Sequence, residues 1–590
     1  MPTVTIDTMR ASVPEGTTIL QAAKSVGVRI PTLCYLEGVH AVGACRVCVV
    51  EVQGAKTLVA SCVMPVSEGM VVHTNTRRVR EGRRTVVELL LSAHEGECQT
   101  CHRSDDCELQ ALARELGIEQ VRYPGEKGRR LLDESTPALV RDSAKCIHCR
   151  RCVTVCNETQ GVGALFPQDR GFDTVIGPAF ASKLEDVVCV QCGQCSAVCP
   201  VGAISERSQI DEVWEALDDP ARHVVVQTAP AIRAALGECF GYPPGTLVTG
   251  KMVSALRRLG FDAVFDTNFT ADLTIMEEGT ELLTRLRAAL VDGKDVPLPM
   301  FTSCSPGWVK YAEHFWPEIL PHISTAKSPQ QMFGAVAKTY YAEKLGRRPE
   351  EIAVVSIMPC TAKKFEAARP EMRASGVQDV DIVLTTRELG RMIKQAGIDF
   401  RSLPDDRMDA PLGLSSGAAD IFANTGGVME AALRTVYELV TGRPLPFDNL
   451  HVEPVAGLKG LKEAALRVEG ALPEWRFLEG VTLKVAVAHG LANARRAIER
   501  VLQDRSAYHF VEVMTCPGGC IAGGGQPRMT DDDVRRARIA AIYREDEGKK
   551  LRKSHDNPDI RQIYEEFLVK PLGEKSHHLL HTHYTVRARV

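Results

Sequence analysis

Two closely spaced runs of cysteines between Ser143 and Val201 constrain this chain more than any other feature of its sequence. Each run has the spacing C-x-x-C-x-x-C-x-x-x-C, and a proline follows the second run. In this arrangement three thiolates of one run bind three irons of a 4Fe-4S cube, and the fourth reaches the neighbouring cube. Zinc is the alternative, but it prefers separated pairs of ligands and does not need four cysteines in a run. The sequence therefore predicts an electron carrier with two 4Fe-4S clusters, one on Cys146, Cys149, Cys152 and Cys199 and the other on Cys156, Cys189, Cys192 and Cys195.

The size and composition of the chain set its general class. At 590 residues it is too long for one hydrophobic core, so several domains are expected. Its 44% hydrophobic and 25% charged residues are ordinary for a soluble protein, and no apolar stretch approaches the roughly 18 residues of a membrane span. The amino terminus lacks the features of a signal segment, so we expect a cytoplasmic location, where 20 cysteines serve better as metal ligands than as disulfides. The net charge of -4 argues against a nucleic-acid partner.

Two groups of basic residues have simpler interpretations than a binding site. Arginines at helical spacing most simply form a solvated helix face, and the alternative is a docking patch for an acidic redox protein. Histidines near the carboxyl end lack an accompanying cysteine or carboxylate pattern, so we expect packing or exposure rather than metal binding. The arginines are Arg77, Arg78, Arg80, Arg83 and Arg84, and the histidines are His577, His578, His581 and His583.

A third cysteine group precedes these runs and lies in strand-like surroundings. A plant-type ferredoxin holds a 2Fe-2S cluster in a long loop with a short C-x-x-C and one distant cysteine. The present loop has ten residues between its first two cysteines where the plant pattern has four. Gly38 and Gly43 suit a loop whose backbone approaches sulfide closely, although they also suit ordinary turns. The sequence predicts a 2Fe-2S cluster on Cys34, Cys45, Cys48 and Cys62.

A fourth group combines one imidazole with three thiols. His94, Cys98, Cys101 and Cys107 lie within 14 residues of polar sequence. Zinc accepts this set as readily as a cluster does, and the other predicted clusters shift the interpretation toward 4Fe-4S. His102 is an alternative ligand, but we favour His94 because the helical stretch 84–92 would present it from a fixed end.

Residues 1–209 resemble, module by module, an electron-input array found in three protein families. These are the large iron-sulfur subunit of respiratory complex I, NAD-linked formate dehydrogenases and iron-only hydrogenases. The array alone does not show which of the three families the chain resembles, so that choice depends on the residues after 209.

After Pro220 apolar runs alternate with helical stretches, which indicates α/β structure with a mostly parallel sheet. The ends of such strands usually carry the chemistry. Three motifs fall at such ends: 302–308 (Thr-Ser-Cys-Ser-Pro-Gly-Trp), 358–363 (Met-Pro-Cys-Thr-Ala-Lys) and 512–520, which leads to Gly523-Gly524-Gly525. Together they resemble the three H-cluster motifs of iron-iron hydrogenases, and residues 326–331 and 425–431 share the similarity.

The resemblance implies a multidomain α+β and α/β protein. Its expected parts are a β-grasp ferredoxin-like domain (1–79), a 4Fe-4S domain with one histidine and three cysteine ligands (80–119), a bacterial double-cluster ferredoxin domain (138–209), a two-lobed α/β H-cluster domain (220–510) and a segment similar to the iron hydrogenase small subunit (511–575).

The resemblance also implies the catalytic cofactor, the H-cluster, which is a 4Fe-4S cube joined by one cysteine sulfur to a di-iron unit with carbon monoxide, cyanide and a dithiolate. Carried over by position, Cys360, Cys516 and Cys520 hold the cube, and Cys520 is the bridge. Lys363 pairs with a cyanide, and Met358 and Met514 line the pocket. As core residues alone, the two methionines would be unremarkable.

The first motif departs from the family pattern, which usually has two adjacent cysteines, a proton relay followed by a cube ligand. Here they are Cys304 and Ser305. Either Ser305 binds the cube through oxygen, or Cys304 becomes the ligand and the relay weakens; the sequence leaves both open.

A proton path to solvent is also implied, from Cys304 through Glu278, Glu281 and Ser324. The two glutamates are three residues apart and would share one helix face. Without the family match, two solvated glutamates would be the simpler interpretation.

These assignments use 19 of the 20 cysteines and leave Cys239 as a small core residue. The expected cofactors are one 2Fe-2S cluster, three 4Fe-4S clusters and the H-cluster. The expected function is that of a hydrogenase, which interconverts H2 with protons and electrons.

Because no nucleotide-binding motif follows a strand, we expect a flavin- and NAD(P)-binding partner subunit, or ferredoxin, as the electron partner. The alternative is a hydrogen or redox sensor, or an assembly protein that keeps the fold without the di-iron unit.

Overall fold

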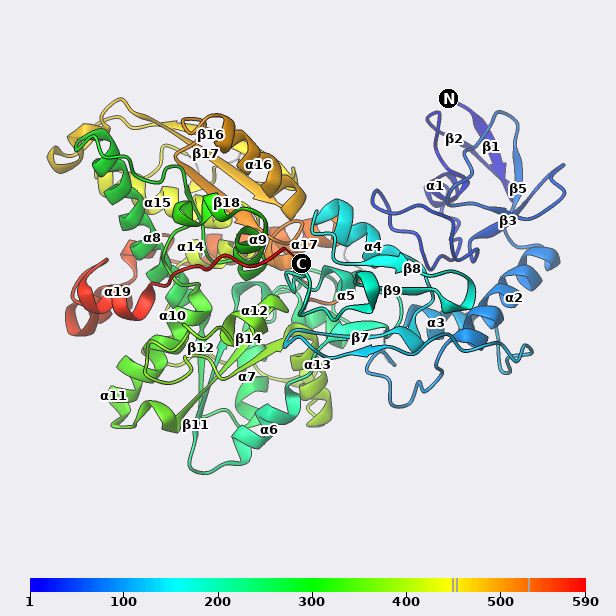
Figure 1. Ribbon diagram of the computed structural model, residues 1–590, viewed down its shortest axis with the longest axis horizontal. Coiled ribbons are helices and arrows are strands. Elements are labelled where there is room, and N and C mark those ends of the chain that lie inside the picture. Colours follow the sequence, from blue (N-terminus) through cyan, green and yellow to red (C-terminus); the bar gives the residue numbers. More distant parts are fainter. Residues whose placement is uncertain (105, 448–449, 453–454, 529–530, 590) are drawn as a thin grey trace.

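The computed structural model describes residues 1–104, 106–447, 450–452, 455–528 and 531–589. Figure 1 shows the chain laid out along its longest axis. The amino-terminal sheet lies at one end, the double-cluster region lies in the middle, and the catalytic region with its two sheets forms the other end.

The first 80 residues form a small mixed sheet over one helix. The strands β1 (Thr3–Ile6), β2 (Met9–Ser12), β3 (Val49–Val52), β4 (Val59–Ala60) and β5 (Val71–His73) lie in the order β2-β1-β5-β3-β4. β1 alternates half-buried and buried residues, so Val4 and Ile6 pack inward against the helix α1 (Ile19–Ser25). Thr18 begins α1 with a reciprocal capping box to Gln21. The predicted ferredoxin-like start of the chain is thereby confirmed.

The helix α2 (Arg77–Ala93) carries the arginine group, and α3 (Glu108–Glu115) follows it. Most of the arginines are exposed or half-exposed, but Arg83 is buried and donates two hydrogen bonds to the carbonyl of Val49, at 3.1 and 2.9 Å. A fully solvated arginine face is therefore wrong for Arg83, which ties α2 to the sheet.

The double-cluster region consists of two short loops that each lead into a short helix. The helices are α4 (Arg151–Thr154) and α5 (Gln194–Val198), and the sheet β10-β7-β6 packs beside them (β6, Leu132–Asp133; β7, Leu139–Asp142; β10, Ile204–Glu206). His148, Arg150 and Gln191 have φ between 52° and 64°, a conformation that non-glycine residues seldom adopt. Such tight loops bring successive thiols toward one point.

The catalytic region contains two four-stranded sheets, which confirms the predicted α/β lobes. The first sheet is parallel, in the order β12-β11-β14-β15, and the second is β13-β18-β17-β16 with only β16 antiparallel. The strands are β11 (His223–Thr228), β12 (Ala263–Asp266), β13 (Met300–Phe301), β14 (Ile352–Met358), β15 (Ile382–Thr385), β16 (Leu461–Arg467), β17 (Thr482–His489) and β18 (Phe510–Met514).

Helices cover both sheets, and the longest of those described has 24 residues. The helices are α6 (Ile210–Asp218), α7 (Thr249–Leu259), α8 (Thr267–Leu290), α9 (Pro306–Phe315), α10 (Pro329–Val336), α12 (Ala362–Ala367), α13 (Thr386–Gln395), α15 (Gly427–Thr441), α16 (Leu491–Gln503), α17 (Asp532–Gly548), α18 (Pro558–Ile563) and α19 (Glu574–Leu580). α8 and α15 contact each other and carry buried side chains on most of their faces.

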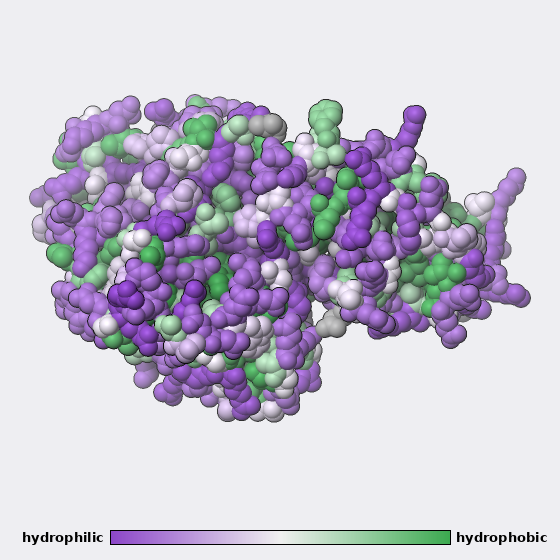
Figure 2. All heavy atoms as spheres, turned by 60° about the horizontal axis from the view of Figure 1, so that its bottom comes forward, coloured by the Kyte–Doolittle hydropathy of each residue, from purple (hydrophilic) through white to green (hydrophobic). Residues whose placement is uncertain are grey.

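The end of the chain returns to the catalytic region. From α19 at the edge of the molecule the last residues run back toward α9, where the carboxyl end lies (Figure 1). Among the described helices, none has the length and apolar character needed to cross a bilayer. The face in Figure 2 is mostly hydrophilic, with hydrophobic residues scattered in small groups.

Candidate iron-sulfur centres and active site

The three predicted motifs meet at one buried cavity between the two catalytic sheets. The first motif follows β13, the second follows β14 and the third follows β18, so each begins at the carboxyl end of a parallel strand. The cavity has a volume of about 80 Å³ and a largely apolar lining. Its lining includes Cys304, Ser305, Met358, Cys360, Lys363, Met514, Cys516 and Cys520.

Of three thiols in this cavity, those of Cys360 and Cys516 are buried and that of Cys520 is half-buried. Burial raises the pKa of Cys360, Cys516 and Cys520, in the last case to about 12. A thiol in such surroundings stays protonated unless a metal takes the place of the proton. Three thiols that line one cavity in this way suit an iron centre.

Cys304 and Ser305 face different neighbours. The Ser305 hydroxyl lies 2.7 Å from the Thr515 hydroxyl and accepts a hydrogen bond from the Thr515 amide at 3.2 Å, directly before Cys516. Burial raises the pKa of Cys304, and the next largest cause is the charge of Glu278. Ser305 therefore lies on the side of the cube thiols, and Cys304 lies on the side of the glutamates.

Lys363 projects from the start of α12 into the same cavity. Its ammonium donates to the Glu366 carboxylate at 2.8 Å and to the carbonyl of Cys304 at 3.1 Å. Met358 and Met514 end β14 and β18, and each is 2% exposed. The site thus places the ammonium of Lys363 beside two buried thioether side chains. Such surroundings suit an anionic ligand of a metal.

The predicted proton path is assembled on α8. Glu278 is 2% exposed, and neither of its carboxylate oxygens has a hydrogen-bond partner among the described residues. Burial, reinforced by the Glu281 carboxylate, raises the pKa of Glu278 to about 8. Ser324 donates to Glu281 at 2.7 Å, so the structure brings this serine and glutamate into direct contact. A carboxyl that is neutral near pH 7 can carry a proton.

Two further residues at this path are absent from the sequence-based prediction. Arg285 donates to Glu281 at 2.6 Å, and the Tyr584 hydroxyl donates to the carbonyl of Ser324 at 2.5 Å. The i,i+4 spacing of Glu281 and Arg285 is a local signal that could have identified the arginine. Tyr584 is 260 residues away from Ser324 and has no such signal.

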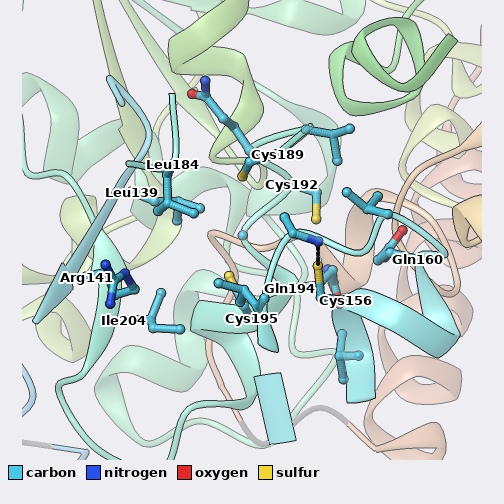
Figure 3. Close-up of a pocket in the computed structure, with 17 residues that line it drawn as sticks. Leu139, Arg141, Cys156, Gln160, Leu184, Cys189, Cys192, Gln194, Cys195 and Ile204 are labelled. Atoms are coloured by element: carbon cyan, nitrogen blue, oxygen red, sulfur yellow. Dashed lines mark hydrogen bonds between the residues drawn. The ribbon is translucent and has the colours of Figure 1, made fainter. Parts of the chain in front are cut away.

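The double-cluster cysteines divide into two groups, as the crosswise ligand pattern predicts. One cavity of about 30 Å³ is lined by Cys156, Cys189, Cys192 and Cys195, and Figure 3 shows these side chains around it. A second, of about 20 Å³, is lined by Cys146, Cys149, Cys152 and Cys199. Backbone amides also point at sulfur: Ala164 donates to Cys156 and His148 donates to Cys146, each at 3.4 Å. Such donors stabilise a charged cluster.

The four amino-terminal cysteines are all buried and lie together. Hydrogen bonds link Cys34 with Cys45 and Cys62, and Cys62 with Cys48. The thiols therefore converge from both ends of the ten-residue loop, as a 2Fe-2S site requires.

His94 directly follows α2, whose end it caps through its backbone amide. The ring is 7% exposed, and its Nδ1 atom has no hydrogen-bond partner among the described residues. His102 also has a partnerless nitrogen, but the charges that most affect its pKa are those of Glu206 and Arg528, and both residues belong to the boundary with the catalytic region. His94 thus has a buried ring nitrogen available to a metal, and its grouping with Cys98, Cys101 and Cys107 stays a prediction.

Of the carboxyl-terminal histidines, His581 is buried, and His577, His578 and His583 are exposed. His577 and His581 stack at 4.7 Å, and His581 lies 3.1 Å from Glu277. Within the described part of the chain no three His, Cys, Asp or Glu side chains form a site for a single metal ion. Cys239 packs against Gly390 on α13.

The double-cluster region and the catalytic motifs touch through their backbones. A Cβ added to Gly524 would lie 2.2 Å from the carbonyl oxygen of Cys192, so only glycine fits there. Gln194 donates to the carbonyl of Ala522 at 2.9 Å, and Thr361 donates to the carbonyl of Gln191 at 2.7 Å. One cluster loop is thus in direct contact with the third motif.

A buried charge network holds the same boundary. Glu206, at the end of β10, accepts hydrogen bonds from Arg387 at 2.6 Å, Arg391 at 2.9 Å and Arg528 at 3.4 Å. The arginines come from α13 and from the segment after the third motif, so the carboxylate joins three parts of the chain.

A row of thiol-lined sites that ends at a dry cavity with a protonatable path defines a redox enzyme of the iron-sulfur class. The region 222–524 matches the family described as "Iron only hydrogenase large subunit, C-terminal domain", and 532–587 matches "Iron hydrogenase small subunit". Residues 1–77, 83–122 and 145–203 match a 2Fe-2S binding domain, the NADH-ubiquinone oxidoreductase-G iron-sulfur region and a 4Fe-4S dicluster domain.

Whole relatives agree with these matches. The chain is 54% identical to the NADP-reducing hydrogenase subunit HndD of Solidesulfovibrio fructosivorans, covering 100% of both chains. It is 39% identical to iron hydrogenase 1 of Clostridium pasteurianum over 99% of this chain and 100% of that protein. A solved variant of the [FeFe]-hydrogenase HydA1 of Chlamydomonas reinhardtii superposes with a TM-score of 0.57 at 45% identity, covering 64% of this chain and 99% of that one.

The chain therefore belongs to the iron-only hydrogenase family. The predicted family, fold class and hydrogenase activity are confirmed, as is the presence of 2Fe-2S, 4Fe-4S and H-cluster domains.

Proposed function

We propose that this hydrogenase interconverts H2 with two protons and two electrons at an H-cluster held by Cys360, Cys516, Cys520 and Ser305. The observation that carries the proposal is the convergence of two buried thiols, one half-buried thiol, a hydroxyl and Lys363 on one apolar cavity. When bound, the H-cluster supplies the redox-active irons at which hydrogen is made or split. Lys363 would hold its cyanide, and Met358 and Met514 would exclude water from it.

The protein supplies the proton route. Cys304 faces the cavity, and Glu278 lies next to it in a site where its pKa is raised to about 8. A group of this pKa both takes up and releases protons near neutral pH. Glu281 and Ser324 continue the route, and Arg285 orients Glu281 through the 2.6 Å hydrogen bond.

The first motif favours Ser305 as the fourth ligand of the cube. Its hydroxyl lies beside the backbone that leads to Cys516, whereas Cys304 lies beside Glu278. This arrangement supports the relay role of Cys304 and an oxygen donor at the cube, and it leaves the relay intact.

The electron route runs through one 2Fe-2S and three 4Fe-4S clusters. The grouping of thiols around two separate cavities supports the two clusters of the double-cluster region. The cluster of Cys156, Cys189, Cys192 and Cys195 would be the last one before the H-cluster, because its loop contacts Gly524 and Ala522.

The electron partner is proposed to be a flavin- and NAD(P)-binding subunit, with ferredoxin as the alternative. The full-length similarity to a subunit named as NADP-reducing supports such a partner, and a cytoplasmic location follows from the same interpretation. If it is right, the purified chain reduces methyl viologen with H2 but reduces NADP+ only after the partner is added. A lone chain that reduces NADP+ at full rate would contradict it.

Infrared spectroscopy tests the catalytic proposal directly. Protein matured anaerobically with the di-iron assembly machinery should show carbon monoxide and cyanide bands and should evolve H2 from reduced methyl viologen. Cys520→Ser is the matched control, because it removes one proposed ligand and should lose the bands while the accessory clusters remain. Iron-loaded wild-type protein with neither bands nor H2 production would support the sensor or assembly alternative instead.

A further inference from the structure

The loop between Cys34 and Cys45 is a folded element. Leu36 and His40 exchange two backbone hydrogen bonds, each 2.8 Å, and Val39 donates to the carbonyl of Leu36 at 3.1 Å. Gly38 has a φ of +68°, which permits the tight turn between them. This loop is longer than that of a plant-type ferredoxin. Its additional residues form a turn that holds His40 in one orientation.

The side chain of His40 is buried against the double-cluster region. It is 3% exposed, its Nε2 atom lies 3.0 Å from the carbonyl oxygen of Cys149, and its Nδ1 atom lies 2.7 Å from the hydroxyl of Thr154. Since a carbonyl only accepts, Nε2 carries the proton and donates it, and Nδ1 accepts from Thr154. Both ring nitrogens are thus satisfied by the segment 149–154.

That segment surrounds the second 4Fe-4S site. Cys149 is one of its proposed ligands, and Thr154 lies on α4 between Cys152 and Cys156. The 2Fe-2S thiols Cys34 and Cys45 belong to the same buried cluster of side chains as Cys149. The two cluster sites therefore share one hydrophobic core, and the His40 ring connects the loops that form them.

The exposed contact near this boundary is weaker. Arg29 bonds Glu115 of α3 at 3.1 Å, but the two side chains are 76% and 45% exposed. Exposed ion pairs of this kind contribute little and are screened by salt. Buried hydrogen bonds such as those of His40 define an orientation better, because leaving them unmade costs more.

We infer that His40 is a positioning residue for electron transfer between the 2Fe-2S cluster and the 4Fe-4S cluster of Cys146, Cys149, Cys152 and Cys199. This inference rests on the proposed cluster assignments. During H2 oxidation, one electron leaves the reduced 4Fe-4S cluster and reduces the 2Fe-2S cluster, and the hydrogenase reaction supplies the electron. His40 sets the distance and orientation of the two clusters by docking the extended loop onto the loop that binds the 4Fe-4S cluster.

The test uses the full, matured chain and H2 gas as the electron source. Rapid-freeze electron paramagnetic resonance follows the reduction of each cluster after mixing, and pulsed measurements report the distance between the two reduced clusters. Losing two buried hydrogen bonds lowers the docked population relative to the undocked one by roughly tenfold. His40→Ala should therefore slow the appearance of reduced 2Fe-2S by up to a similar factor and broaden the distance distribution, with unchanged iron content.

Matched variants separate docking from damage to the 2Fe-2S loop. Val39→Ala alters a side chain that is 42% exposed in the same turn and should behave as wild type. His40→Gln keeps an amide donor for the Cys149 carbonyl and should restore part of the rate. If His40→Ala loses its cluster, Thr154→Val removes the Nδ1 partner from the other side of the boundary and should slow transfer while both clusters are retained.

The outcomes are distinct. Wild-type transfer and an unchanged distance distribution in both His40→Ala and Thr154→Val would overturn the role of His40 and leave the hydrogenase proposal standing. A wild-type chain in which H2 reduces no 2Fe-2S cluster at all would overturn the cluster assignments themselves.

Discussion

Replacing Glu278 by glutamine should make the enzyme slower and, at alkaline pH, more stable. Glu278 is buried without a hydrogen-bond partner among the described residues, and its pKa is raised from an ordinary 4.5 to about 8. The charged form is therefore disfavoured in the folded protein. From these two pKa values, ionisation of Glu278 lowers the free energy of unfolding by about 5 kcal/mol. The loss occurs as the pH rises from below 4.5 to above 8.

The direction of the pH dependence follows from proton binding. Between pH 4.5 and about 8 the folded state holds the proton of Glu278 and the unfolded state does not, so stability falls as the pH rises through this window. Glutamine does not titrate. The stability of Glu278→Gln should match that of wild type near pH 4.5 and should exceed it by up to about 5 kcal/mol near pH 8.5. Removing a group that transfers protons should lower H2 evolution by about 100-fold or more.

Two assays on the matured protein check this prediction. H2 evolution from reduced methyl viologen measures the rate, with infrared bands as the control for H-cluster content. Scanning calorimetry from pH 5 to 8.5 follows the thermal transition of the catalytic region. A variant that keeps wild-type activity, or whose transition depends on pH as in wild type, would refute the reasoning.

Glu277→Gln is the matched control on the same helix. Glu277 accepts hydrogen bonds from Tyr564 at 2.5 Å, the Leu572 amide at 2.9 Å, His581 at 3.1 Å and Ser576. Burial alone would raise its pKa, but these donors outweigh burial and lower it. Glu277→Gln should therefore lose stability at pH 7, because its carboxylate contributes stability above its ordinary pKa, and the two neighbouring glutamates should respond with opposite sign.

Three other substitutions test the remaining assignments. Ser305→Cys adds a fourth thiol at the proposed cube and should change the paramagnetic resonance spectrum of that cluster alone; an unchanged spectrum would mean that residue 305 is not a ligand. Gly524→Ala places a Cβ 2.2 Å from the Cys192 carbonyl, so the two backbones must separate, and H2-driven reduction of the double-cluster region should slow while the infrared bands remain. Glu206→Gln leaves buried arginines without their anion and should cost about 3 to 5 kcal/mol, seen as a lower thermal transition; an unchanged transition would show that this network does not stabilise the boundary.

Sequence alone determined the parts that depend on local spacing. Cysteines two or three residues apart can reach one cluster only from a single tight loop, so the C-x-x-C runs indicated the crosswise division of ligands that the two cavities of the structure reproduce. The three motifs that follow strands were also recognisable from local sequence, because each lies within a few residues of its strand. The i,i+3 spacing likewise placed Glu278 and Glu281 together on α8.

Tertiary packing determined which side chains from distant parts of the sequence contact each other. The sequence left Cys304 and Ser305 interchangeable, and their neighbours Glu278 and Thr515 distinguish them only after folding. Arg83 looked like a surface residue because spacing does not reveal that β3 lies across its helix. Tyr584 and His40 carry no motif, and their partners lie 260 and more than 100 residues away. Hydrophobic burial brings such distant residues together through the summed packing of whole elements, which no local pattern encodes.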